Sequence, residues 1–181
     1  MGLLPLLFSA GVSHNPYNYD TIELKRRIAI LESNGNWRAV NVKSGALGKY
    51  QFLPSTLESM RKRRLIDTTE KNLCKMNFLA DTVLQEAYMD KLLSMNLDKI
   101  KKNRYGELVG QEIDGVTVTL EGMLAASHLL GFYSVDWYVS CLKDINPGLR
   151  NRFDKYPDRV LMEDGMGTPI TKYLRIMELN L

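Results

Sequence analysis

A chain of 181 residues with 45% hydrophobic and 25% charged residues is long enough to form one domain with a sizeable core. Its net charge of +3 favours the approach to anionic polymers but is too small to indicate a nucleic-acid-binding protein. Two cysteines are too few for a disulfide framework, and we expect Cys74 and Cys141 to be buried free thiols.

The first 19 residues are distinct from the rest of the chain. Residues 3–8 are apolar, but no Lys or Arg precedes them, and the run is too short for a signal peptide or a membrane span. We interpret residues 1–19 as an N-terminal arm that docks on the domain or on a partner protein. A disordered leader is the alternative. The domain itself is expected to occupy residues 20–181, and no transmembrane segment is expected.

The first predicted helix begins after Asp20, which can cap it, with Glu23 three residues later in the pattern of a capping box. The helix is expected to end at Asn34-Gly35, because both residues tolerate the left-handed conformation at a helix C-terminus. Its apolar stripe has helical spacing and consists of Leu24, Ile28 and Leu31.

Glu32 follows the last residue of this stripe, so it should lie at the rim of the buried face. The C-terminal end of a helix and partial burial both disfavour a second negative charge. Both effects favour the protonated carboxyl that a general acid needs near neutral pH. The alternative is an ordinary solvated glutamate at a helix end. The next carboxylate in the sequence is Glu58, so the intervening loop holds no second acid.

Two segments of the sequence resemble the catalytic signature of the lytic transglycosylases of the lysozyme-like superfamily. They are Glu32-Ser33 and the stretch Ser44 to Thr56, which contains Gly48-Lys49-Tyr50-Gln51. The family has a Glu-Ser pair followed by a Gly-x-x-Gln segment, and the Lys-Tyr form is similar to a branch found in phage virion proteins and secretion-spike effectors. Later segments fit in the same order, and the resemblance covers about Asp20 to Met177: Gln85-Glu86-Ala87, Thr119 to Gly131, and Asp164 to Thr168.

The resemblance implies a mainly α, lysozyme-like helical domain with a small β-hairpin beside the substrate cleft. The pair Asp114-Gly115 is typical of a tight hairpin turn, and it is flanked by the segments Leu108 to Ile113 and Val116 to Thr119. Residues 146–164 are expected to be irregular, because they contain Pro-Gly and Tyr-Pro turns.

Local signals also predict the remaining helices. Ser55 and Glu58 form a capping-box pattern for a helix that runs to about Arg64. Its basic end, Arg61 to Arg64, suits a helix C-terminus, with a wall or nucleic-acid contact as the alternative. A central helix is predicted from about Phe78 to Met95, with a stripe widened by Leu79, Val83 and Ala87. Further helices are expected at Leu120 to Leu130, after Ser134, and after Thr168-Pro169.

The resemblance assigns site residues by position. Glu32 would be the catalytic acid, Ser33 and Gln51 would orient the site by hydrogen bonds, and Tyr173 would position the acid. Glu86 would reach the cleft or brace its wall, His128 would lie on the substrate wall, and Tyr50 and Trp37 could offer flat faces to sugar rings. Purely structural roles are the alternatives. Gln85 and Glu86 would lie on an exposed helix turn, and His128 would be packed and hydrogen-bonded. Tyr173 and Trp37 would pack in the core or in a loop.

The implied reaction is cleavage of the β-1,4 bond between N-acetylmuramic acid and N-acetylglucosamine in peptidoglycan. Most glycosidases need two carboxylates, whereas a lytic transglycosylase needs one, which agrees with the isolation of Glu32. A hydrolytic muramidase with a second carboxylate is one alternative, and its candidates are Glu86, Glu58 and Asp164. A structural virion component that binds glycan without cutting it is another, and cleavage of chitin or chitosan is a third.

The expected partners are peptidoglycan glycan strands and, through the N-terminal arm, other virion or secretion-apparatus proteins. No cofactor is expected, and no metal site, because the two histidines have no close ligand spacing. Without a signal peptide, we expect a chain that is made in the bacterial cytoplasm and carried to the cell wall by a virion or a secretion apparatus.

Overall fold

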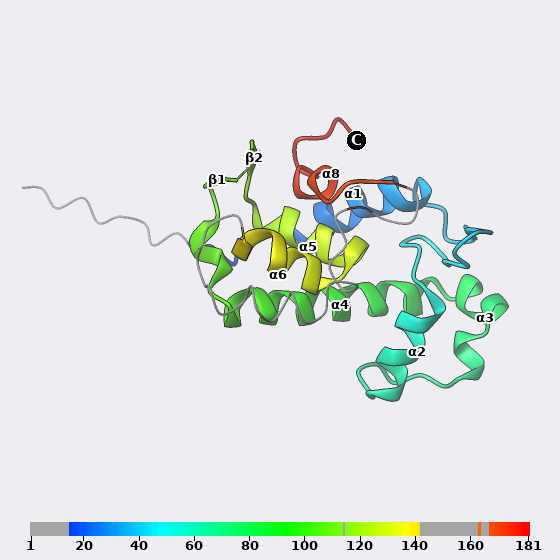
Figure 1. Ribbon diagram of the computed structural model, residues 1–181. Helices are drawn as coiled ribbons and strands as arrows, with labels where there is room; N and C mark the ends of the chain where they lie inside the picture. The colour runs from blue at the N-terminus through cyan, green and yellow to red at the C-terminus, as the bar shows by residue number, and fades with distance from the viewer. Residues whose placement is uncertain (1–14, 114, 142–162, 164–166) are drawn as a thin grey trace, which may run out of the picture.

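The computed structural model describes residues 15–113, 115–141, 163 and 167–181, and this part of the chain is mainly helical. The long helix α4 (Thr82–Lys102) crosses the molecule below α5 (Leu120–Leu130) in Figure 1. Helices α1 (Thr21–Ser33) and α8 (Ile170–Leu174) lie on the other side of α5. Helix α5 therefore contacts α4, α1 and α8 as well as α6 (Phe132–Cys141), and it is the centre of the packing.

Helix α1 begins and ends at the predicted residues. The Asp20 side chain accepts hydrogen bonds from the backbone N–H groups of Ile22 and Glu23, which satisfies two otherwise unpaired donors. Asn34 ends the helix in the left-handed conformation, with φ of 54°. The Glu23 side chain does not complete the predicted capping box, because its carboxylate pairs with Arg26 and Arg27 instead.

Between α1 and α2, residues 34–52 form a folded loop. Isolated bridges pair Leu47 with both Val40 and Phe52, so the segment turns back on itself twice. Leu47, Tyr50 and Phe52 are buried in the core, which anchors the loop against the helices. This loop, which carries the Gly-Lys-Tyr-Gln signature, is the segment that follows Glu32 directly.

Helix α2 spans Pro54–Lys62 and does not use the predicted capping box. Its N-cap is Leu53, which makes no side-chain cap, and Pro54 begins the helix because its fixed φ suits the first turn. The Glu58 carboxylate forms ion pairs with Arg61 and Lys62 instead of reaching back to the helix start. A short 3-10 helix, η1 (Lys71–Leu73), then leads to α3 (Lys75–Ala80).

The single central helix predicted from Phe78 to Met95 is in fact two helices. Asp81 separates α3 from α4 and caps α4, accepting a hydrogen bond of 2.8 Å from the backbone N–H of Leu84. The buried face of α4 is shifted relative to the prediction, so Val83 is 78% exposed and Ala87 is also exposed. The side chains that α4 buries are Leu84, Gln85, Tyr88, Met89, Leu93, Asn96 and Ile100.

Two short strands, β1 (Glu112–Ile113) and β2 (Val116–Thr117), pair antiparallel after the 3-10 helix η2 (Tyr105–Leu108). The resemblance implied that this pair lies beside the substrate cleft, and this stays a prediction. The strands lead into the N-terminal end of α5, whereas Glu32 lies near His128 in the last turns of α5. Eight residues of helix separate the two places, which is about 12 Å at 1.5 Å per residue. In Figure 1 the strands and the C-terminal end of α1 lie toward opposite ends of the molecule.

Helix α5 has the predicted bounds, with the Thr119 hydroxyl capping it through the Gly122 N–H at 2.9 Å. Helix α8 starts one residue later than predicted, with Pro169 as its N-cap and no side-chain cap. The two helices touch at Gly122, where a Cβ atom would overlap the carbonyl of Leu174. Glycine at this position therefore sets how closely α8 approaches α5.

Three further predictions concern the ends and the surface. Residues 15–19 of the expected arm pack on the domain: Tyr17 lies against Gly106 and under the ammonium of Lys101, and Tyr19 packs on the core. Cys74 is exposed, not buried as predicted. Residues 1–14, Asp114, the predicted irregular segment 146–162, Asp164 and the Cys141 side chain lie outside the described residues. Within the described part, no helix has both the length and the apolar character that a membrane span requires.

Candidate active site

Glu32 occupies the last turn of α1, with a side chain that is 15% exposed. The phenol of Tyr173, on α8, donates a hydrogen bond of 2.6 Å to its Oε1. Tyr173 itself is buried, so the donor is held firmly in place. Among the described residues no hydrogen bond is made to Oε2. The predicted contact between the final helix and the acid is present.

His128 lies against the same carboxylate but does not bind it. Its Nε2 is 3.9 Å from Oε1 of Glu32 and 2.8 Å from the carbonyl oxygen of Tyr50. A carbonyl can only accept, so Nε2 carries the hydrogen in this bond. The ring packs edge-on against Phe52, and its buried Nδ1 has no partner in the described part of the chain. His128 is therefore a packed, hydrogen-bonded histidine that also borders Glu32.

The signature loop is held by side chains from three helices. The Lys49 N–H donates to Gln85 Oε1 on α4 at 2.8 Å, and the Lys49 carbonyl accepts from Ser33 Oγ on α1 at 2.7 Å. The next carbonyl, that of Tyr50, accepts from His128 on α5. Ser33 is therefore bonded to the loop behind Glu32, and it orients the loop and not the carboxylate.

Gln85 is the residue that sequence reasoning undervalued. Its side chain is buried, and its Nε2 donates to the carbonyls of Trp37 and Phe78 at 3.1 and 3.0 Å. With Oε1 on the Lys49 N–H, the amide joins the loop, α3 and α4. Gly48 has φ of 78°, and a Cβ there would collide with this amide, so glycine is required. A polar residue within an apolar helix face was the signal available in the sequence.

The expectation that Tyr50 offers a flat face to sugar is wrong. The residue is fully buried, and its hydroxyl donates to Glu86 at 2.9 Å. Burial, and then the hydrogen bond to Glu86, raise the pKa of the Tyr50 phenol above its ordinary value. Tyr50 therefore supports the loop from within the core. The ring of Trp37 is likewise covered on one side, by the Lys49 ammonium 4.5 Å from its centroid.

Glu86 braces the loop that follows Glu32, and its predicted place at the wall of a cleft stays a prediction. Its carboxylate pairs with Lys25 at 2.6 Å and with Lys49 at 2.8 Å, in addition to Tyr50. Burial alone would raise the pKa of Glu86, but the hydrogen bonds from these three residues outweigh it and lower the pKa. The alternative of a solvated helix turn is wrong for both Gln85 and Glu86.

Gln51 faces its own loop. It has a left-handed backbone with φ of 50°, and its Nε2 donates to the Gly48 carbonyl at 2.8 Å. No hydrogen bond joins Gln51 to Glu32 among the residues that the structure describes. Its amide thus stabilises the turn that follows Gly48. The predicted role of Gln51 in orienting the site by hydrogen bonds is thus limited, among the described contacts, to its own loop.

Two of the three candidates for a second carboxylate form ion pairs away from Glu32. Glu86 is bound by two lysines, and Glu58 by Arg61 and Lys62, while Asp164 lies outside the described residues. The described residues include no group of three or more His, Cys, Asp and Glu side chains that could hold a metal ion. The arrangement around Glu32 can thus hold and release one proton at a partly exposed carboxyl. Comparisons with models of protein families, with curated proteins and with solved structures found no match.

Proposed function

We propose that this protein is a peptidoglycan lytic transglycosylase that cleaves the β-1,4 bond between N-acetylmuramic acid and N-acetylglucosamine, with Glu32 as its single general acid and base. The observation that carries the proposal is the partly exposed Glu32 carboxyl, held at one oxygen by the buried Tyr173 phenol. A proton donor in this reaction must be fixed in position and still reachable by substrate. The Tyr173 hydrogen bond supports the first condition, and the 15% exposure of the Glu32 side chain supports the second.

In the proposed reaction, protonated Glu32 gives its proton to the leaving glycosidic oxygen. The N-acetyl carbonyl of the substrate shields the cationic sugar carbon that results. Glu32, now ionised, takes the proton of the muramic acid C6 hydroxyl, whose oxygen attacks C1 and closes a 1,6-anhydro ring. The nucleophile belongs to the substrate and has a high effective concentration, so no water needs activation.

The contacts of the other residues indicate the role of each in the proposed site. Tyr173 keeps Oε1 of Glu32 in place, which leaves Oε2 to face the substrate oxygen. Ser33, His128 and Gln85 hold the Lys49-Tyr50 backbone, so they support the loop that borders the acid. These are positioning residues, and the chemistry rests on one carboxyl.

The test is an analysis of reaction products. Purified peptidoglycan is incubated with the protein, and the soluble fragments are identified by mass spectrometry. Anhydro-muropeptides support the proposal. Reducing ends would instead indicate a hydrolytic muramidase, with a second carboxylate still to be located. A zymogram without clearing, together with retained binding to glycan in a pull-down, would indicate the non-catalytic virion component.

We further propose delivery to the cell wall by a virion or a secretion apparatus, with residues 1–14 available to other proteins of that assembly. The support is the apolar run at residues 3–8 and the way in which residues 15–19 pack on the domain just after it. Cross-linking of the full chain within an assembled particle would identify such a contact.

A further inference from the structure

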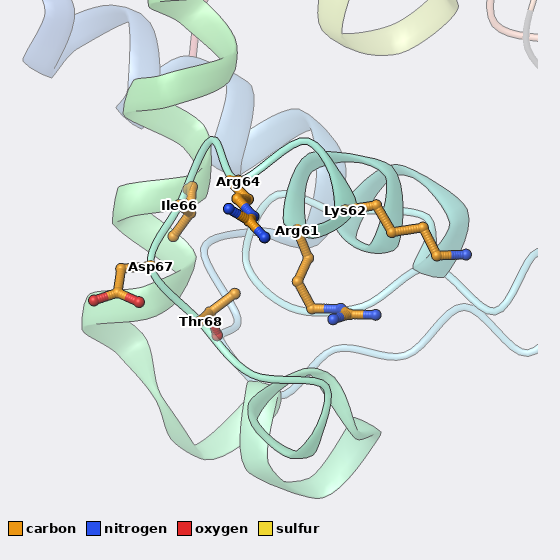
Figure 2. Close-up of a pocket in the computed structure, with 6 residues that line it drawn as sticks. All are labelled: Arg61, Lys62, Arg64, Ile66, Asp67 and Thr68. Atoms are coloured by element: carbon orange, nitrogen blue, oxygen red, sulfur yellow. The ribbon is translucent and has the colours of Figure 1, made fainter.

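A pocket opens at the C-terminal end of α2, away from Glu32. It has a volume of about 560 Å³ and is lined by Arg61, Lys62, Arg64, Ile66, Asp67 and Thr68 (Figure 2). In Figure 1, α2 and the C-terminal end of α1 lie at the same end of the molecule, with the loop 34–52 between them. The pocket therefore adjoins the end of the molecule that carries the candidate active site.

Two arginines define the hollow. Arg61 is fixed by two hydrogen bonds to Glu58, from Nε to Oε2 at 2.7 Å and from Nη2 to Oε1 at 2.6 Å. Arg64 makes no side-chain hydrogen bond or ion pair with any residue that the structure describes. Figure 2 shows Arg61 and Arg64 on two sides of the hollow. The site thus combines one cation in a fixed position with one whose guanidinium is free to bind a ligand.

The other lining groups leave the pocket positive. Lys62 is mostly exposed, and its distance of 3.4 Å to Glu58 leaves most of its ammonium in solvent. The Asp67 carboxylate points away from the two arginines in Figure 2. The Thr68 hydroxyl is buried and has no hydrogen-bond partner in the described part of the chain. In Figure 2 this oxygen points away from the two arginines, so the hydroxyl does not face the hollow.

The helix dipole explains why basic residues are favoured at this helix end, but it does not explain why they surround one hollow. Basic residues at a helix C-terminus normally extend into solvent, where they interact with the last carbonyls. Here Arg64 has a left-handed backbone with φ of 53°, a conformation that is costly for a residue with a side chain. The turn places Arg64 beside the hollow, opposite Arg61.

We propose that this basic pocket binds an oxyanion of the cell wall, a phosphate or a carboxylate, and so anchors the protein to the polymer that it cleaves. The inference rests on the proposed function for the choice of polymer. Planar guanidinium groups match the oxygens of phosphate and carboxylate in bidentate geometry. The phosphate would come from a phosphodiester polymer attached to the wall, and the carboxylate from a stem peptide.

Nucleic acid is a poorer match to the same residues. Single-stranded nucleic acid is bound by aromatic side chains interleaved with basic ones, and no aromatic residue lines this pocket. Duplex binding uses an extended basic surface, whereas these cations surround one hollow in a chain of net charge +3.

The experiment uses the full chain with Glu32→Gln, so that binding is measured without cleavage. Arg64→Gln removes the free cation of the pocket, and Arg63→Gln is the matched control, because Arg63 is exposed and does not line the pocket. Retention is measured on intact walls, on the same walls stripped of phosphodiester polymer with hydrofluoric acid, and on double-stranded DNA, with inorganic phosphate as competitor.

We expect Arg64→Gln to weaken wall binding about tenfold, as the loss of a charge-assisted hydrogen bond would, while Arg63→Gln changes it little. A loss confined to intact walls identifies phosphate as the ligand, and an equal loss on stripped walls identifies carboxylate. Equal effects of the two arginine variants on wall binding would overturn the proposal, as would an Arg64 effect that is seen on DNA alone. These results are independent of product analysis, so either proposal can fail alone.

Discussion

The hydroxyl of Tyr173 lies 2.6 Å from Oε1 of Glu32, although 141 positions separate the two residues in the chain. The contact joins the end of the first helix to the last helix, and His128 of α5 borders it at 3.9 Å. The candidate site is thus assembled from three helices that meet around α5, not from one contiguous motif.

Glu32→Gln should abolish glycan cleavage and leave the fold intact. The amide keeps the size of the carboxyl and can still accept the Tyr173 hydrogen bond, but it cannot donate and recover a proton. Loss of general acid–base catalysis alone typically costs about 10²- to 10⁴-fold in rate. The measurement is release of soluble muropeptides, with thermal unfolding to verify the fold. Glu178→Gln, at an exposed position of the same charge, is the control, and activity retained by Glu32→Gln would contradict the assignment.

Tyr173→Phe should lower the rate and alter its pH profile, because Oε1 of Glu32 loses the donor that positions it. The loss in stability should be about 1 kcal/mol, the net contribution of one hydrogen bond. Rates across pH 4–9 in the two proteins provide the test. Tyr88→Phe removes a buried hydroxyl that bonds to Leu57 on α2, and it should leave the rate unchanged. Equal effects of the two substitutions on the rate would show that Tyr173 is only a core residue.

Gln85→Leu should destabilise the protein by about 3 kcal/mol, because unpaired buried groups are costly. The substitution leaves the Lys49 N–H and the Trp37 carbonyl without their partner, while the Phe78 carbonyl keeps only its bond from the Asp81 N–H. Denaturation with urea measures the change. Gln111→Leu is the control, since this glutamine is exposed and bonds only within its own turn. A loss no larger than that of the control would show that the amide does not hold the loop.

Glu86→Gln should remove part of the acid sensitivity of the fold. Hydrogen bonds from Lys25, Lys49 and Tyr50 outweigh burial and hold the pKa of Glu86 below its ordinary value of 4.5. A lowered pKa means that the charged form stabilises the fold above pH 4.5, and this contribution is lost as the pH falls through the folded-state value. The difference in unfolding free energy between wild type and variant should therefore be largest near neutral pH and shrink below 4.5.

The variant must be compared with the wild type at each pH, because Glu23 and Glu58 have pKa values of about 2 and titrate in the same acid range. Both are shared by wild type and Glu86→Gln, so their contribution cancels in the difference. A difference that stays constant from pH 7 to pH 2 would contradict the role given to Glu86.

Gly122→Ala should reduce both stability and activity. Its Cβ would overlap the Leu174 carbonyl, so α8 must move away from α5 and carry Tyr173 with it. Overpacking of this kind costs about 1–3 kcal/mol. Met123→Leu, a swap of similar volume at the next buried position of α5, is the control for a disturbed core. A Gly122→Ala protein with the wild-type rate would show that the position of α8 is not critical.

Local signals predicted the helix ends best. Asp20 and Asn34 bound α1, and Thr119 and Gly131 bound α5, because capping depends on a few neighbouring residues. The break at Asp81 was missed, since apolar residues continue at helical spacing on both sides of it and the cap is a single side chain. The helical conformation on both sides of Asp81 was therefore predictable, but the boundary between α3 and α4 was not.

The site was predictable where it depends on residue order and not where it depends on packing. Glu32 and Tyr173 meet as the resemblance implied. The burial of Tyr50 could not be read from the loop, because it depends on Glu86 and the α4 face behind it. The side chains of Ser33 and Gln51 bind the backbone of the loop 34–52, which no pattern of residue types distinguishes from binding a ligand.

The distance along the chain between Glu32 and Tyr173 also has a consequence for synthesis. On the ribosome, α1 emerges well before α8, because 141 positions separate Glu32 from Tyr173. A nascent or prematurely terminated polypeptide would hold its acid without the phenol that orients it. The hydrogen bond that holds Oε1 of Glu32 can therefore form only after α8 has been synthesised and has packed on α5.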